Sequence, residues 1–81
     1  MKKTFAPTSN PNLNVPMTNT QWDIVDFIAF ENETSLKYPF KVAFNDLTME
    51  HINEIIETCK ELDDLESIYS ACEKVLGVVD N

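Results

Sequence analysis

Arginine is absent from this chain, and positive charge is scarce in general. The 81 residues hold six lysines and one histidine against 14 acidic residues, which gives a formal net charge of −8. Affinity for phosphate groups comes from clustered lysine and arginine, so this composition argues against direct binding to nucleic acid or to an anionic membrane. It favours a protein partner with a basic surface, because complementary charge steers association.

Glycine and long apolar runs are also scarce. With Gly77 as the only glycine, the chain has no loop of the kind that cradles phosphate groups. No stretch approaches the roughly 20 apolar residues that a membrane span needs. The start, MKKTFAPTSNP, has a basic pair but no apolar run behind it, so it does not read as a secretory signal. We therefore expect a cytoplasmic protein that does not bind membranes.

Residues that bind metals or act as nucleophiles are few and poorly spaced. His51, Cys59 and Cys72 show none of the short paired spacings of zinc sites. Cys59 lies two helical turns after His51, about 12 Å away, which is too far for a catalytic pair. In a helix hairpin the two cysteines would sit at different levels, so we expect two small buried side chains without a disulfide. The sequence predicts no enzyme, no catalytic residue, no metal and no cofactor.

Apolar residues make up 43% of the chain, which is enough for the core of one small domain. Residues 1–20 carry three prolines, so we expect an extended or flexible N-terminal arm there. Residues 21–81 would then form a single small domain rich in helix. Six aromatic residues fall within 23 positions, and we interpret them as core, or as a core partly exposed for binding. These residues are Trp22, Phe27, Phe30, Tyr38, Phe40 and Phe44.

Two segments in the first half of the chain carry patterns of secondary structure, one ambiguous and one clear. Residues 21–31 fit a helix capped by Thr20, or a strand interrupted by Asp26. Apolar residues alternate over 38–44, which predicts a short edge strand or extended segment. Its partner would be residues 13–17, residues 22–30 or a second copy of the chain.

The second half of the chain has a helical period. We predict helices at 48–62 and 64–76 that form a hairpin, with Thr48 and Asp63 as their N-caps and Gly77 as a C-cap. A single long helix is the alternative. Helical spacing predicts a buried stripe on each helix, made of Ile52, Ile55, Ile56, Cys59 and Leu62, then Leu65, Tyr69, Cys72, Leu76 and Val79. The predicted fold class is α+β and mostly helical, with an all-α domain as the alternative.

Five acidic residues recur at helical spacing near the predicted hairpin: Glu50, Glu54, Glu57, Glu61 and Asp64. Like charges at such spacing cost a few tenths of a kcal/mol per pair, and few lysines lie near enough to relieve them. The row is either the solvated face of an amphipathic helix or a docking face for a basic groove.

On this basis we expect non-enzymatic protein–protein binding through the acidic row. The sharper hypothesis is a small acidic inhibitor of a basic, nucleic-acid-handling protein, like those with which phages and mobile elements block restriction or CRISPR enzymes. That comparison rests on size and charge alone. The alternative is a structural or assembly subunit that self-associates as a homo-oligomer, with the stripe of Leu65, Tyr69, Cys72 and Leu76 between chains.

Overall fold

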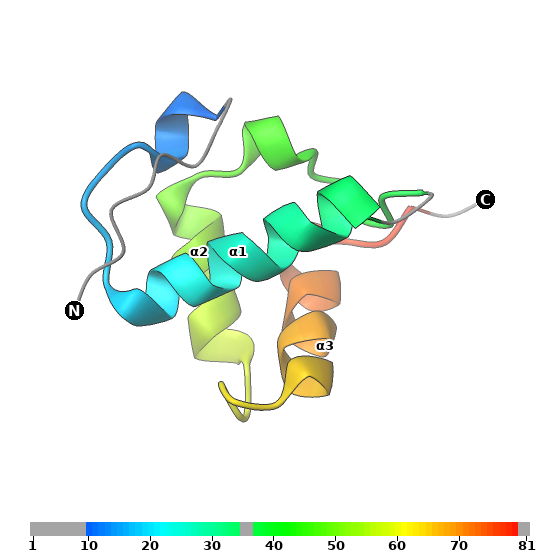
Figure 1. The fold of residues 1–81 in the computed structure, drawn as a ribbon. Coiled ribbons are helices and arrows are strands. Elements are labelled where there is room, and N and C mark those ends of the chain that lie inside the picture. Colours follow the sequence, from blue (N-terminus) through cyan, green and yellow to red (C-terminus); the bar gives the residue numbers. More distant parts are fainter. Residues whose placement is uncertain (1–9, 35–36, 80–81) are drawn as a thin grey trace.

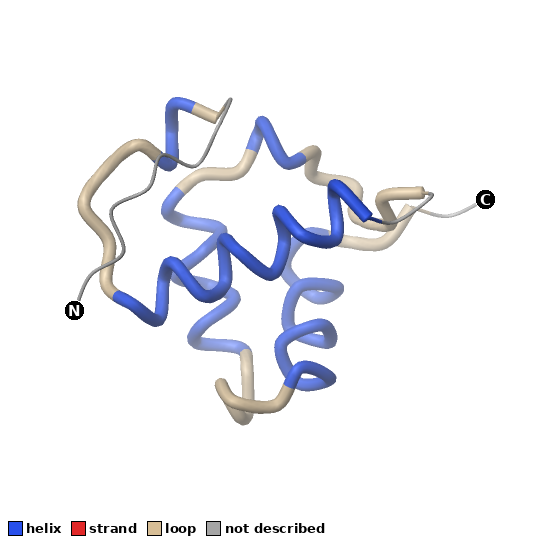
Figure 2. Tube along the Cα trace, in the orientation of Figure 1, coloured by secondary structure: helices blue, strands red, loops and turns tan. Residues whose placement is uncertain are grey.

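A computed structural model describes residues 10–34 and 37–79, which form a small helical domain. The elements in chain order are η1 (Pro11–Leu13), α1 (Asn19–Thr34), η2 (Phe44–Asp46), α2 (Met49–Thr58) and α3 (Leu65–Leu76), where η marks a 3-10 turn. Helices α2 and α3 lie side by side, and α1 crosses them as a second layer (Figure 1). The described ranges contain no strand, as Figure 2 shows. The mostly helical prediction is confirmed, and its α+β part is not supported.

Helix α1 resolves the ambiguity of residues 21–31 in favour of a helix. The predicted cap, Thr20, is wrong, because the helix begins at Asn19 and Thr18 makes the capping contacts. The Gln21 amide donates to Thr18 Oγ1 (3.2 Å), and the Thr18 amide donates to Gln21 Oε1 (2.9 Å). This reciprocal pair is a capping box, which satisfies amide groups that the first turn leaves without partners.

The predicted hairpin of α2 and α3 forms, but with a longer connection than expected. Thr48 caps α2 as predicted, whereas α2 ends at Thr58, four residues before the predicted end. Cys59 turns into extended backbone (φ −70°, ψ 131°), and its thiol donates to the Glu61 carbonyl. The predicted cap of α3, Asp63, is also wrong by one residue. Asp64 is the cap, and it accepts from the Glu66 amide and from the Ser67 hydroxyl (3.2 Å each).

The segment predicted as an edge strand makes only a single antiparallel bridge, between Phe40 and Val78. Three backbone hydrogen bonds join residues 39–42 to residues 76–79, at 2.8–3.3 Å between nitrogen and oxygen. This partner was not among those predicted for the segment. The chain reaches it because Gly77 leaves α3 at φ +75° and ψ 157°, a conformation open to glycine and costly for other residues.

Part of the predicted N-terminal arm packs into the core. Leu13 and Met17 are buried, and Asn10 is fully buried although it is polar. Its side-chain amide donates to the carbonyls of Phe44 (2.7 Å) and Leu47 (3.0 Å). Residues 10–18 therefore belong structurally with the helices, and residues 1–9 lie outside the described part of the chain.

The core lies between the two layers and is almost wholly apolar. Its buried apolar members are Leu13, Met17, Trp22, Ile24, Val25, Ile28, Phe40, Phe44, Leu47, Ile52, Ile55, Ile68, Ala71, Cys72 and Leu76. None of the helices in the described part of the chain combines the length and apolar character that crossing a membrane requires.

Candidate interaction surfaces

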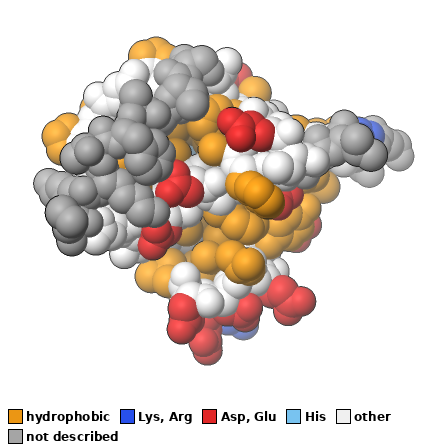
Figure 3. Space-filling view, viewed as in Figure 1, with side chains coloured by type: hydrophobic (Ala, Val, Ile, Leu, Met, Phe, Trp, Pro, Cys, Tyr) orange, Lys and Arg blue, Asp and Glu red, His pale blue; other side chains and the backbone are white. Residues whose placement is uncertain are grey.

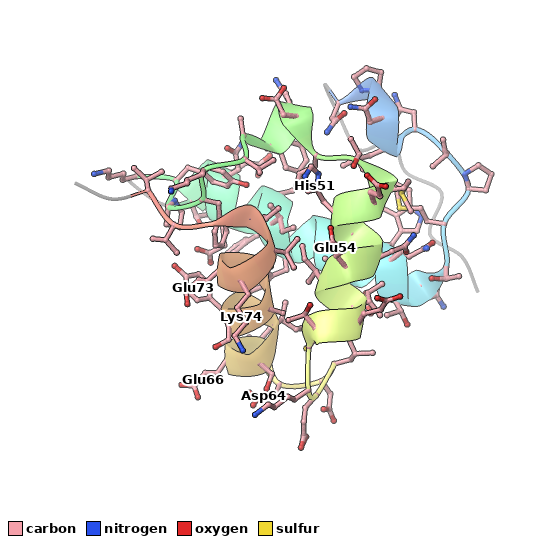
Figure 4. All side chains as sticks on the ribbon, turned by 180° about the vertical axis from the view of Figure 1, so that it is seen from behind. His51, Glu54, Asp64, Glu66, Glu73 and Lys74 are labelled. Carbon is pink, nitrogen blue, oxygen red and sulfur yellow. The ribbon has the colours of Figure 1, made fainter. Side chains whose placement is uncertain are left out.

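Three of the five predicted carboxylates lie together on the outer face of α2. Glu50, Glu54 and Glu57 are exposed, and at 100° per residue they fall within about 60° around the helix axis. Glu54 points outward from α2 in Figure 4. We call these three residues the α2 acidic face.

The other two predicted carboxylates do not extend this face along the helix. Glu61 lies in the connection after α2, because the helix ends at Thr58. Asp64 is held in the cap of α3 by its two hydrogen bonds, so its carboxylate already has a structural role. The predicted row of five is thus a helical face of three followed by two residues in the turn.

The three acidic residues differ in how well a negative charge suits their position in α2. Glu50 lies in the first turn, where the helix dipole favours negative charge. Glu57 lies in the last turn, which contains no basic residue, and a carboxylate there opposes the dipole at a cost of about 0.3–1 kcal/mol. Glutamate is a good helix former in general, but the helix dipole does not account for its place in the last turn.

The histidine and the cysteines serve the fold. His51 completes a capping box with Thr48, in which His51 Nδ1 accepts from the Thr48 amide (3.1 Å). Sequence reasoning considered His51 only as a metal or catalytic residue, although Thr48 and His51 stand at the capping-box spacing. Cys72 is fully buried, and burial raises the pKa of its thiol to about 12. Cys59 is half-buried, and neither cysteine forms a disulfide.

One cavity of about 340 Å³ lies between the end of α2 and α3. Its lining residues are Thr58, Lys60, Asp64, Glu66, Ser67, Ser70, Ala71 and Lys74. Its two lysines and two carboxylates offset each other, so it selects for neither an anion nor a cation. Across the described residues, no group of three or more histidine, cysteine, aspartate or glutamate side chains could hold a metal ion.

A second surface is apolar, and most of it was predicted to be core. Leu62 and Leu65 belong to the predicted buried stripes, but 45% and 65% of their surfaces are exposed. Leu62 is exposed because α2 ends before reaching it, and Leu65 because it is the first residue of α3, next to the connection that joins the two helices. Phe30, with 61% of its surface exposed, is the member of the aromatic group that lies outside the core.

The surfaces are the only guide to function within the described structure. The chain matches no protein family, no curated protein sequence and no solved structure. The proposals below therefore rest on the charge, exposure and contacts of the residues above.

Proposed function

We propose that this chain is a non-enzymatic binding protein that docks on a basic protein through the α2 acidic face. The observation that carries the proposal is Glu57, an exposed carboxylate in the last turn of α2. It adds repulsion to Glu54 and opposes the helix dipole, so it costs stability where it stands. The net charge of −8 also attracts a basic partner at long range.

The sharper form of the proposal is an inhibitor of a nucleic-acid-handling protein. A surface that binds phosphate groups is rich in lysine and arginine, and a row of carboxylates is its natural competitor. Such an inhibitor would occupy the groove that otherwise holds DNA or RNA. It would need no cofactor, and the partner would lose nucleic-acid affinity when this protein is added.

The test is a pull-down of the tagged protein from nuclease-treated lysate of the source organism, with low-salt and high-salt washes. We expect capture of a basic DNA- or RNA-binding protein, weakened at high salt. The double variant Glu54→Lys/Glu57→Lys should reduce affinity by about tenfold or more, since two attractive contacts become repulsive. The purified partner should also bind its nucleic acid less tightly when the wild-type protein is present.

A matched control is the double variant Glu33→Lys/Asp46→Lys, which changes the charge equally at exposed positions outside α2. It should retain most of the affinity. Glu57→Lys alone should also raise the thermal stability slightly, because a lysine suits the last turn of a helix. Equal capture by the wild type and the Glu54→Lys/Glu57→Lys variant would refute the proposal.

Self-association is the second candidate, and the exposure of Leu65 and Phe30 favours it. The predicted inter-chain stripe is only partly available, because Cys72 and Leu76 are buried within their own chain. Native mass measured at dilute and concentrated protein distinguishes a homo-oligomer from a monomer that binds another protein.

A further inference from the structure

Five large apolar side chains form a continuous surface, which we call the outer apolar patch: Phe27, Phe30, Leu62, Leu65 and Tyr69. Phe30 and Phe27 are one turn apart on α1, and the Phe27 ring meets the Tyr69 ring edge to face at 6.2 Å between centroids. Leu65 lies one turn before Tyr69 on α3, and Leu62 lies in the connection just before it. Figure 3 shows hydrophobic side chains gathered on this side, below α1, with mostly acidic side chains and some lysine near their lower edge.

The exposed members of the patch contribute little to the core. Phe30 lies two residues after Ile28, about 160° around α1 from that fully buried side chain. Leu65 is the first residue of α3 and most of its surface faces solvent. Single exposed apolar residues are ordinary, but a contiguous group that includes three aromatic rings is typical of an interaction site.

Carboxylates lie beside part of the patch. The hydroxyl of Tyr69 has its pKa raised by partial burial first, and then by the carboxylates of Glu73 and Glu31 nearby. Lys60 and Lys74 line the cavity between α2 and α3 instead, and Lys74 faces the viewer in Figure 4, on the side opposite to that of Figure 3. An occupant of the patch would therefore meet apolar side chains at the centre and carboxylates at the edge.

This charge pattern distinguishes between two occupants. A second copy related by a two-fold axis would place the same surface against itself, so the carboxylates near Tyr69 would approach their own equivalents. Like charges opposed across an interface cost affinity. A segment with lysine or arginine beside its apolar face would instead be attracted by the same carboxylates.

We infer that the outer apolar patch binds an amphipathic helical segment of a protein partner, with an apolar face that covers Phe30, Tyr69 and Leu65 and basic residues that meet the surrounding carboxylates. Helices dock in this way when apolar side chains repeat at i, i+3, i+4 and i+7. The inference rests on the proposed function, because it takes the partner to be basic. It adds a second contact surface, on a different side of the molecule from the α2 acidic face.

The two surfaces should affect binding kinetics differently. Exposed charges mainly raise the association rate through steering, and that effect fades with salt. Buried apolar contacts mainly slow dissociation. Loss of the patch should therefore raise the dissociation rate at every salt concentration, whereas loss of the α2 acidic face should lower the association rate at low salt.

The probe for the test is a fluorescent peptide of leucine and lysine, with leucine at the i, i+3, i+4 and i+7 positions. A scrambled peptide of the same composition lacks the apolar face, and a third peptide carries glutamate in place of lysine. Binding is measured by fluorescence anisotropy with the full chain, and the contacted residues are mapped by amide chemical shifts. The patch variant is Phe30→Ser/Leu65→Ser, and its matched control, Val15→Ser/Val79→Ser, changes two exposed apolar residues elsewhere.

We expect the amphipathic peptide to bind with Kd on the order of micromolar, and the other two peptides to bind about tenfold more weakly or not at all. Phe30→Ser/Leu65→Ser should weaken binding by about tenfold or more, while the control changes it less than about twofold. Circular dichroism should show that both variants stay folded, because the substituted side chains are exposed. Amide shifts should centre on residues 27–30 and 62–69.

Four results would overturn the inference. Equal binding of the scrambled peptide would show simple charge attraction, and absence of binding by any peptide would show no helix site. A wild-type dimer that the patch variant dissociates would show that a second copy covers the patch. If only Glu54→Lys/Glu57→Lys abolishes partner capture while the patch variant captures normally, the proposed function stands and this inference fails.

Discussion

The buried side chain of Asn10 offers the sharpest test of how the N-terminal segment joins the domain. Its amide group donates to the carbonyls of Phe44 and Leu47, and its oxygen accepts from the Asn12 amide (2.9 Å). Substitution by alanine removes both donors and leaves two buried carbonyls without these partners. Each such loss costs about 1–3 kcal/mol, so Asn10→Ala should lower the free energy of unfolding by about 2–6 kcal/mol. A chain of this length has a total of only about 4–12 kcal/mol.

Asn10→Asp should destabilise the protein more than Asn10→Ala at neutral pH. The carboxylate nearly matches the amide in shape, but it cannot donate and it faces two carbonyl oxygens. Burial beside those oxygens would raise the carboxyl pKa of the folded variant above its unfolded value of about 4. The penalty should therefore be complete above the folded pKa and should shrink as the pH falls towards 4, because the protonated carboxyl regains one donor.

Urea unfolding followed by fluorescence of the single tryptophan, Trp22, provides the measurement, since this side chain is buried in the core. Asn14→Asp is the matched control, because it adds the same charge at an exposed position near Asn10. We expect that control to stay within about 0.5 kcal/mol of the wild type. If Asn10→Asp and Asn14→Asp unfold at the same urea concentration, residues 10–18 do not belong to the folded core.

Two further predictions concern Gly77 and Cys72. Gly77→Ala should lower the free energy of unfolding by about 1–3 kcal/mol because of the positive φ. Adding Lys41→Ala should restore only the part of this loss that arises because the new Cβ lies 3.1 Å from Lys41 Cδ. Full recovery of stability in the double variant would show that backbone strain is unimportant. A thiol reagent at pH 8 should label Cys59 in the native protein and Cys72 only after unfolding, and rapid labelling of both would contradict the described packing. The free energy of unfolding should also fall as the pH rises from about 9 to about 12, because the unfolded chain releases the Cys72 proton before the folded chain does. Cys72→Ala should reduce this fall, and the remainder would come from Tyr38, whose pKa burial raises to about 12, and from Tyr69, whose pKa is also raised.

Local signals in the sequence predicted the start of α2 and the end of α3, but they misplaced the other helix boundaries. Thr48 was identified as a cap, and Gly77 was placed correctly at the end of α3. The capping box of Thr18 and Gln21 was also readable from its spacing, but Asp23 drew attention to Thr20 instead. The same kind of error moved the α3 cap from Asp64 to Asp63, because neighbouring residues offered equivalent side chains.

Contacts between distant residues could not be predicted in this way. The partner of Phe40 is Val78, and nothing within one helical turn of either residue indicates the other. The burial of Asn10 depends on carbonyls 34 and 37 residues away. The exposure of Leu62 and Leu65 likewise follows from the early end of α2, which changes what their apolar periodicity means. The sequence therefore predicted an acidic surface near α2, but not which carboxylates share one helical face or which apolar side chains are exposed.

Hydrogen bonds hold the stretch between α1 and α2, which contains only the short η2, at two places: Asn10 binds one part of it and residues 76–79 bind the other. Both sets of hydrogen bonds join residues more than 30 positions apart, whereas the α2–α3 hairpin forms between helices that follow each other in the chain. Because a long loop must close before distant contacts can stabilise the fold, the hairpin should form early in folding and the two sets of distant hydrogen bonds late. During synthesis on the ribosome, the full set of hydrogen bonds to residues 76–79 cannot form until residue 79 has emerged. Until then, residues 39–42 lack these partners, and the amides of Lys41 and Val42 exchange with solvent as in an unfolded chain.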